Sequence, residues 1–204
     1  MLYARVGTDL DGDWPRPATV VERYYKTYFY AGKSSQPGGE EDESKRKFDQ
    51  YVQCHSNGIA VVGLSPLHPV VKDRKPVQRI EWDVAKSGSS RANVECNGKR
   101  KRGAVIIESN SYLCKVVCTD GAEYMVHAAI RGKLVETNKI LINTPTFLSA
   151  ETAADQGWIA IILLQAGASA KIANRGGLLS WEQYSKLRAS ENDSETNNKP
   201  PQVT

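Results

Sequence analysis

The segment Leu113-Cys-Lys-Val-Val-Cys-Thr-Asp-Gly-Ala-Glu-Tyr-Met-Val-His-Ala128 is the most informative part of the chain. Mostly apolar residues lie on both sides of Thr119-Asp-Gly121, and in a strand successive side chains point to opposite faces. Asp and Gly favour tight turns, because Asp accepts local hydrogen bonds and Gly adopts positive φ angles. The segment therefore predicts strands over 113–118 and 122–128, joined at an Asp120-Gly121 corner. One face of each strand is expected to carry Cys114, Val116, Cys118, Tyr124, Val126 and Ala128.

A β pattern of this kind extends from Asp49 to about Leu164. Ser56-Asn-Gly58 separates two apolar runs, 51–55 and 59–64, and Asn-Gly is a strong signal of a hairpin turn. Further strands are predicted over 77–83, 103–108, 130–137 and 157–164. Together these segments predict a mainly β domain, a flattened barrel-like sandwich of two small sheets with a core of Val, Ile and Leu.

Two helices are expected to flank the strands. Thr19-Val-Val-Glu22 has the spacing of a capping box, in which both side chains bond free N–H groups of the first turn. We predict a helix over 19–29, with an apolar stripe packed on the core that consists of Val20, Val21, Tyr24, Tyr25 and Tyr28. Ser180-Trp-Glu-Gln183 is a second capping box and predicts a helix over 181–189. Its buried face is expected to contain Trp181, Tyr184 and Leu187, with Leu179 packed on Tyr184.

The remaining segments predict little regular structure. Residues 1–18 are rich in Gly, Pro and Asp and are expected to form a flexible N-terminus. Residues 31–47 contain an acidic run followed by Lys45-Arg-Lys47, and like charges keep such a loop solvated. Residues 190–204 have too little apolar surface to offset the entropy of ordering and are expected to be a disordered tail. The prediction is therefore one domain over 19–189, with a charged loop at 31–47.

The composition limits the class of protein. The chain has 204 residues and a net charge of +4, which is too small to imply nucleic-acid binding by itself. No apolar run approaches the ~18 residues that cross a bilayer, and the first residues lack the apolar core of a signal peptide. We therefore expect a protein that is neither exported nor membrane-spanning, with its four cysteines as reduced thiols.

The sequence contains no recognisable catalytic motif. A nucleophile elbow, a Walker loop, a dinucleotide-binding Gly motif and a His-Glu-x-x-His helix are all absent, so no enzyme activity, cofactor or small-molecule substrate is expected. Cys114 and Cys118 would lie ~13 Å apart along a strand, too far to share a zinc ion. His55 and His68 are expected to make local hydrogen bonds near turns rather than to act as bases.

Lys99-Arg-Lys-Arg102 is the most distinctive polar feature, and it lies between Gly98 and Gly103. Four consecutive positive charges are typical of a nuclear address, of a phosphate-binding stretch or of a surface that contacts an anionic partner. The alternative is a solvated turn without a binding role. No aromatic residues interleave with the run, so stacking on single-stranded nucleic acid is not supported. We predict that Lys99, Arg100, Lys101 and Arg102 form part of a partner-binding surface.

The second half of the chain resembles the glycine cleavage H protein. The matching segments, in order, are Ile130-Arg-Gly-Lys-Leu-Val-Glu-Thr-Asn138, Asn143-Thr-Pro-Thr-Phe-Leu148, Gln156-Gly-Trp-Ile-Ala-Ile161 and Ser180-Trp-Glu-Gln-Tyr184. This resemblance implies a lipoyl-carrier-like fold. A lipoyl carrier presents a lysine at the tip of a hairpin, and the family's spacing from Gly132 places that position at Gly121. Lys115 lies too far down the preceding strand, so the lipoylation lysine is missing.

A more specific resemblance is to the Abitram (Simiate) family of eukaryotic proteins. The similar segments are Val21-Glu-Arg-Tyr-Tyr25, Cys54-His-Ser-Asn57, Leu67-His-Pro-Val70, Lys101-Arg-Gly103, Leu113-Cys-Lys115, Cys118-Thr-Asp-Gly121, Glu123-Tyr124 and Arg131-Gly-Lys-Leu134. The resemblance implies a barrel-sandwich hybrid, the fold of lipoyl and biotinyl carriers, with short N- and C-terminal helices. It also implies a non-enzymatic protein that binds actin, modulates filament assembly and resides in the nucleus and the cytoplasm. The charged segment 31–47 and the long C-terminal tail depart from the family pattern.

Two other functions remain open at this point. A carrier of lipoyl or acyl groups would follow from the resemblance to the H protein. A nuclear scaffold associated with RNA or protein assemblies would follow from the run at 99–102 and would bind nucleic acid in a salt-dependent way.

Overall fold

The computed structural model describes residues 18–31, 48–84, 90–92, 94, 96, 103–148, 153, 156–165 and 177–197, with side chains to residue 189. The predicted flexible N-terminus up to residue 17, the charged loop from residue 32 and the end of the tail from residue 198 lie outside these residues.

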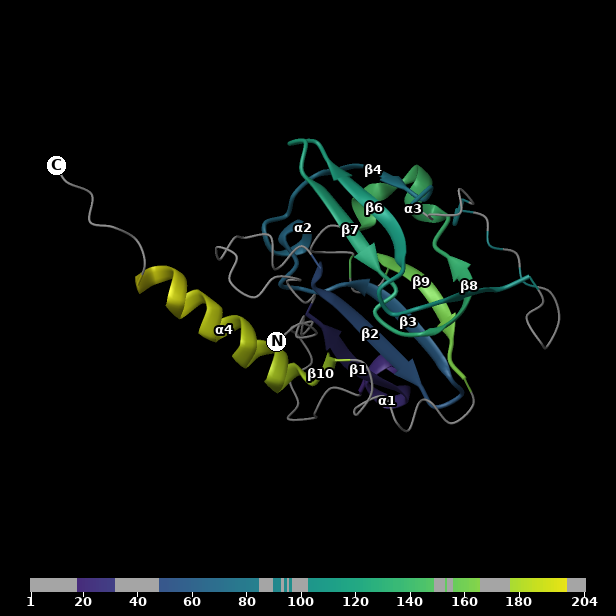
Figure 1. Cartoon of the computed structure of the whole chain (residues 1–204), viewed down its shortest axis with the longest axis horizontal. Helices are drawn as coiled ribbons and strands as arrows, with labels where there is room; N and C mark the ends of the chain where they lie inside the picture. The colour runs from purple at the N-terminus through teal and green to yellow at the C-terminus, as the bar shows by residue number, and fades with distance from the viewer. Residues whose placement is uncertain are drawn as a thin grey trace, which may run out of the picture.

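The described strands form two antiparallel sheets (Figure 1). The larger has seven strands in the order β10-β1-β2-β3-β9-β8-β5, and the smaller has three in the order β4-β6-β7. The strands of the larger sheet are β1 (Tyr25–Tyr30), β2 (Gln50–His55), β3 (Ile59–Leu64), β5 (Val105–Ile107), β8 (Gly132–Thr137), β9 (Trp158–Leu163) and β10 (Leu178–Leu179). The smaller sheet contains β4 (Val77–Glu81), β6 (Tyr112–Cys118) and β7 (Glu123–His127). The predicted mainly β architecture is confirmed.

Short helices lie around the sheets. They are α1 (Val20–Tyr24), α2 (Pro69–Lys72), α3 (Ile140–Asn143) and a 3-10 helix over Pro145–Leu148, followed by the longer α4 (Trp181–Asn197). The 3-10 helix and α3 pack against each other and against β4 of the smaller sheet.

The two predicted hairpins are present. The β2–β3 hairpin turns at Asn57-Gly58, where Gly58 has a φ of 91° and Ile59 donates its N–H to the Asn57 side chain. The β6–β7 hairpin turns at Asp120-Gly121, where Gly121 has a φ of 81°. Both corners therefore follow from residues that tolerate the backbone conformation of a tight turn.

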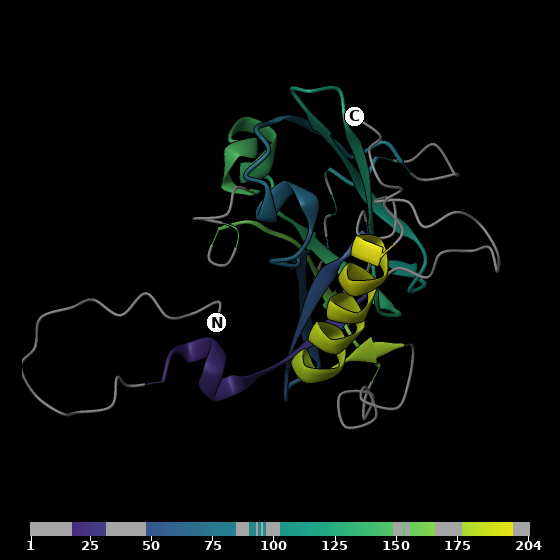
Figure 2. The same ribbon diagram turned by 90° about the vertical axis from the view of Figure 1, so that its left-hand side faces the viewer.

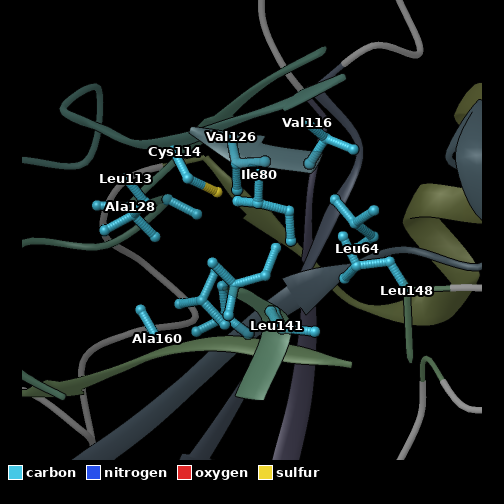
Figure 3. Packing of buried hydrophobic residues seen from close by; sticks show 14 of the residues in the cluster. Leu64, Ile80, Leu113, Cys114, Val116, Val126, Ala128, Leu141, Leu148 and Ala160 are labelled. Atoms are coloured by element: carbon cyan, nitrogen blue, oxygen red, sulfur yellow. The ribbon is translucent and has the colours of Figure 1, made fainter. Parts of the chain in front are cut away.

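The hydrophobic core lies between the two sheets. Figure 3 shows Ile80, Cys114 and Val126 of the smaller sheet converging with Leu141 of α3 and Ala160 of β9. Removing such side chains from water stabilises the fold by roughly 25 cal/mol per Å² of apolar surface. A second cluster, Phe29, Tyr51 and Tyr184, packs α4 on the other side of the larger sheet, with the rings of Phe29 and Tyr184 stacked at 4.8 Å.

The helix predicted over 19–29 is wrong beyond Tyr24. The capping box forms as expected, with the Thr19 side chain accepting from Glu22, but Tyr25–Tyr30 forms β1 and pairs along its length with β2. Aromatic and β-branched residues pack well on a sheet, and pairing with β2 satisfies the backbone. None of the residues of α1 is buried, so Val20, Val21 and Tyr24 do not belong to the core, and Figure 2 shows α1 standing out from the body. Tyr28, also predicted in the stripe, packs against the core from β1.

Helix α4 also differs from its prediction. Ser180 and Gln183 form the expected capping box, and Tyr184 is fully buried. Trp181 and Leu187, however, are 37% and 39% exposed, and Arg188 is buried in their place. The helix continues to Asn197, so residues 190–197 are helical rather than disordered as predicted. In Figure 1 its far end runs away from the sheets.

A buried polar cluster holds α4 to the larger sheet. The Asp49 carboxylate has no exposed surface and accepts hydrogen bonds from both the Arg188 guanidinium and the Tyr184 hydroxyl, the latter at 2.6 Å. The Ser65 hydroxyl lies 2.8 Å from the Tyr184 oxygen. Burial and the neighbouring Asp49 charge raise the pKa of Tyr184. The charge of Arg188 and that of Asp49 therefore offset each other in the interior.

The residue next to Asp49 connects the two sheets. The Gln50 side chain donates to the backbone oxygen of His127 at 2.6 Å and accepts from its N–H at 2.9 Å. The His127 ring lies among the rings of Tyr30, Phe48 and Tyr112, with centroid distances of 4.9–6.0 Å. Desolvation lowers the pKa of His127, so the neutral imidazole is favoured in the folded protein.

Removing one partner of the buried ion pair is expected to destabilise the protein strongly. Arg188→Met leaves the Asp49 carboxylate buried without its cation, at a cost of about 3–5 kcal/mol in the free energy of unfolding. The double variant Asp49→Leu/Arg188→Met is expected to recover most of this loss, because it removes both charges. Urea denaturation measures the effect, and Lys186→Met on exposed α4 is the control. Equal stability of Arg188→Met and the wild type would contradict the role of the pair.

The lowered pKa of His127 predicts a loss of stability in mild acid. Its folded-state pKa lies below that of an unfolded His, about 6.5, so the stabilisation is present above that value and is lost as the pH falls through the folded pKa. We expect the urea midpoint to fall between about pH 7.5 and 5.5, and His127→Phe to reduce this fall. An identical pH dependence in the variant would contradict the prediction.

Candidate functional site

The β6–β7 corner is where the sequence resemblance to the glycine cleavage H protein places the lysine of a carrier. Here the four residues between the strands, Thr119 to Ala122, contain no amine side chain. Asp120 accepts from the N–H of Ala122 at 2.9 Å, and Gly121 donates its N–H to Cys118 at 3.1 Å. The corner is therefore a closed turn in which the Asp side chain stabilises the backbone, as predicted.

Lys75 brings an ammonium group to this corner from outside the hairpin. Its Nζ lies 2.9 Å from Asp120 Oδ2 and 5.9 Å from the centre of the Tyr124 ring. The bond to Asp120 raises the pKa of Lys75. The backbone bond to Ala122 and the bond to Lys75 lower the pKa of Asp120. Both groups are therefore held in their charged forms, which makes the Lys75 amine a poor nucleophile.

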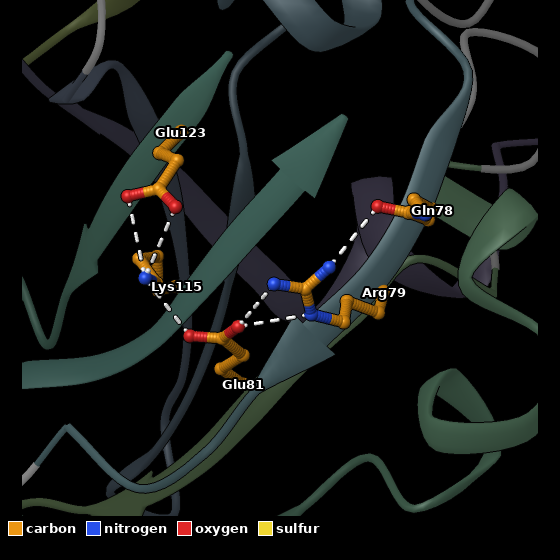
Figure 4. A network of polar contacts seen from close by, with 5 residues as sticks. All are labelled: Gln78, Arg79, Glu81, Lys115 and Glu123. Atoms are coloured by element: carbon orange, nitrogen blue, oxygen red, sulfur yellow. Dashed lines mark hydrogen bonds and ion pairs between the residues drawn. The ribbon is translucent and has the colours of Figure 1, made fainter. Parts of the chain in front are cut away.

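Lys115 belongs to a polar network on the outer face of the smaller sheet (Figure 4). Its Nζ lies 2.9 Å from Glu81 and 3.2 Å from Glu123, so it contacts both neighbouring strands. Arg79 contacts Glu81 at 2.8 Å and donates to the Gln78 side chain at 3.1 Å. The bonds from Lys115 and Arg79 lower the pKa of Glu81.

This network, which comprises Arg79, Glu81, Lys115 and Glu123, is electrically balanced. Two positive and two negative side chains alternate across three strands, so their electric fields largely cancel at a distance. Salt screens the remainder beyond the Debye length. Exposed pairs of this kind contribute little stability individually. Lys115 lies within β6 and is engaged on both sides.

The histidines and cysteines have structural roles. His55 and His68 each accept, through Nδ1, from a backbone N–H two residues further on, at 3.1 and 3.2 Å, which confirms the expected local hydrogen bonds. Cys54, Cys114 and Cys118 are buried, and burial raises the pKa of the Cys54 thiol to about 12. Burial raises the pKa of Cys114 and Cys118 as well.

The described residues contain no group of three or more His, Cys, Asp and Glu side chains arranged to hold a metal ion. No helix in the described part of the chain has the length and apolar character needed to cross a membrane.

The predicted partner-binding residues Lys99, Arg100, Lys101 and Arg102 lie outside the described residues. The chain is described again from Gly103, two residues before β5 begins. Sequence reasoning missed the ion pair between Lys75 and Asp120. These residues are 45 positions apart, and neither belongs to a motif that links them.

Similar proteins were found by sequence and by structure. No protein-family model matches the chain. Curated proteins named Protein Abitram include one from Dictyostelium discoideum, 36% identical over 83% of this chain and 88% of that protein. The protein from Homo sapiens is 30% identical over 89% of this chain and 93% of that protein. The protein from Danio rerio is 29% identical over 91% of this chain and 97% of that protein.

A crystal structure of a glycine cleavage system H protein from Mycobacterium marinum is similar at a TM-score of 0.49 and 14% identity, over 69% of this chain and 91% of that chain. The sequence matches span nearly the whole length of relatives from an amoeba to vertebrates, at identities of 29–36% in the proteins named above. The resemblance stated from the sequence is thereby confirmed, and the chain belongs to the Abitram family.

Proposed function

We propose that this protein is a non-enzymatic actin-binding protein that modulates filament assembly, with pools in the nucleus and the cytoplasm. The proposal rests on membership of the Abitram family, for which the sequence resemblance implies this function. The ion-paired charges on the smaller sheet and the buried cysteine thiols are compatible with a protein that acts by binding a partner at its surface.

The environments of the cysteine and histidine side chains support a non-enzymatic role. Three of the four cysteines are buried with raised pKa values, and His55 and His68 bond neighbouring backbone groups. A catalytic thiol needs a lowered pKa and access to its substrate. In this protein the same residue types stabilise the core and the turns.

The residues at the β6–β7 corner favour a protein that binds a partner over one that carries a lipoyl group. The turn contains Asp120 and Gly121 where a carrier has its lysine, and the nearby Lys75 is held by Asp120 at 2.9 Å. A carrier arm must be free to swing, whereas Lys75 is restrained by an ion pair and by the Tyr124 ring.

Co-sedimentation with actin filaments and the rate of actin polymerisation test the proposal. We expect the purified protein to pellet with filaments or to change the polymerisation rate at micromolar concentration. Absence of binding to both monomeric and filamentous actin would overturn it.

We propose that the basic run at 99–102 is part of the surface that contacts actin, as an anionic partner. Replacing Lys99, Arg100, Lys101 and Arg102 by Glu is expected to weaken binding at low salt at least about ten-fold, because like charges repel. Stability should fall by less than about 1 kcal/mol, as for most surface changes. Reversing the charges of Lys45-Arg-Lys47 is the matched control. A large drop in melting temperature, or equal effects of both variants, would contradict the assignment.

The raised thiol pKa values predict slow reaction with a disulfide reagent. In the native protein at about pH 8, Cys54, Cys114 and Cys118 are expected to stay unmodified, while the half-buried Cys96 reacts first. All four should react after unfolding in denaturant, which is the control. Rapid native modification of Cys54, Cys114 or Cys118, located by peptide mass spectrometry, would contradict the structural role of these thiols.

A further inference from the structure

The end of β7 is joined to the start of β2 by hydrogen bonds from one side chain. The Gln50 amide donates to the backbone oxygen of His127 at 2.6 Å and accepts from its N–H at 2.9 Å. β2 belongs to the larger sheet and β7 to the smaller one, so these bonds bridge the two sheets. The next residue, Ala128, donates its N–H to the backbone oxygen of Ser111 at 2.8 Å. We call the pair of Gln50 and His127 the clasp.

The ring of His127 is packed in a way that leaves no place for a second proton. It lies among the rings of Tyr30, Phe48 and Tyr112, at centroid distances of 6.0, 4.9 and 4.9 Å. Its Nδ1 is buried and has no hydrogen-bond partner in the part of the chain that the structure describes. In the neutral ring with its proton on Nε2, Nδ1 is only an acceptor. A further proton on Nδ1 would be a buried donor without an acceptor, which is costly.

The acidic groups of the neighbouring elements do not compensate a charge on this ring. The carboxylate of Asp49, next to Gln50 in the chain, is paired with Arg188 of α4. On β7 itself, Glu123 lies at the opposite end of the strand and is paired with Lys115. Among the described residues no ion pair joins a carboxylate to the imidazole.

The other polar groups around the ring also disfavour a positive charge. Tyr30 of β1 and Tyr112 of β6 are the titratable groups on the flanking strands, and burial raises the pKa of Tyr30, which keeps that phenol neutral. The guanidinium of Arg91 donates to the backbone oxygen of Tyr112, so the nearby charge on this side is positive. Desolvation lowers the pKa of His127 in the same direction. Protonation is therefore unfavourable as long as the ring stays packed.

We propose that Gln50 and His127 form an acid-sensitive clasp between the two sheets, which opens locally in mild acid while the core between the sheets stays packed. Protonated His127 leaves its place among the rings of Tyr30, Phe48 and Tyr112, because water can then solvate Nδ1. The backbone bonds to Gln50 break with this movement, and the three aromatic rings gain exposure. Such an opening is distinct from global unfolding, since only the end of β7 is released. It does not depend on actin being the partner.

Amide hydrogen exchange of the wild type, followed residue by residue by NMR at about pH 7.5 and 5.5, tests the clasp. Protection factors, corrected for the exchange rate of the unfolded chain, should fall at least about three-fold in acid at His127 and Ala128. Exchange by local opening is insensitive to low concentrations of urea, whereas exchange by global unfolding accelerates. We therefore expect urea to accelerate exchange at Val62, which is fully buried in β3, and to leave His127 and Ala128 unchanged. Unchanged protection in acid, or the urea dependence of Val62 at all three amides, would overturn the proposal.

Two variants separate the roles of the two residues. His127→Phe keeps an aromatic ring in place but cannot be protonated, so protection of Ala128 should be equal at both pH values. His55→Asn at the β2–β3 turn is the matched control and should keep the acid response. Gln50→Ala removes the side-chain bonds and is expected to open the strand end already at about pH 7.5, with Gln78→Ala on β4 as its control.

The melting temperature of each variant shows whether it is folded, and the wild-type measurement decides the proposal where a variant is not. An acid response in His127→Phe as large as in the wild type would overturn the proposal. Full protection of Ala128 in folded Gln50→Ala at neutral pH would overturn it as well.

Discussion

The buried carboxylate of Asp49 is the constraint on which the position of helix α4 depends. It has no exposed surface, and it is compensated by Arg188 and by the Tyr184 hydroxyl, both from α4. A carboxylate in the interior is costly without such partners. The larger sheet therefore requires α4 in place, and the stacked rings of Phe29 and Tyr184 extend the same contact to β1. Helix α4 is thus fixed to the larger sheet through its first two turns.

The neighbouring residue, Gln50, holds the smaller sheet to the larger one. Its amide bonds the backbone N–H and oxygen of His127 at the end of β7, so two consecutive residues fix α4 and the β6–β7 hairpin. Asn138 has a similar role at the end of β8, where it donates to the backbone oxygens of Gln156 and Trp158. Buried backbone groups need partners, and in this fold polar side chains supply them at the points where strands end.

The sequence predicted those elements that local chemistry determines. The Asn57-Gly58 and Asp120-Gly121 corners formed as expected because positive φ and side-chain hydrogen bonds select these residues. The stretch Tyr25–Tyr30 was predicted as helix, since its aromatic residues also fit a helical spacing, and only pairing with β2 decides the outcome. Arg188 was not among the residues predicted to be buried, because its partner, Asp49, lies 139 positions away. The basic run at 99–102 could be recognised from the sequence alone. The sequence pattern does not show which residues surround it.

Ion pairs keep the charges on the smaller sheet balanced. On the smaller sheet Asp120 pairs with Lys75, and Glu81 and Glu123 pair with Lys115, so that face exerts little field at a distance. Glu81 and Glu123 are thus offset between neighbouring strands, and Asp120 is offset by Lys75, which precedes β4.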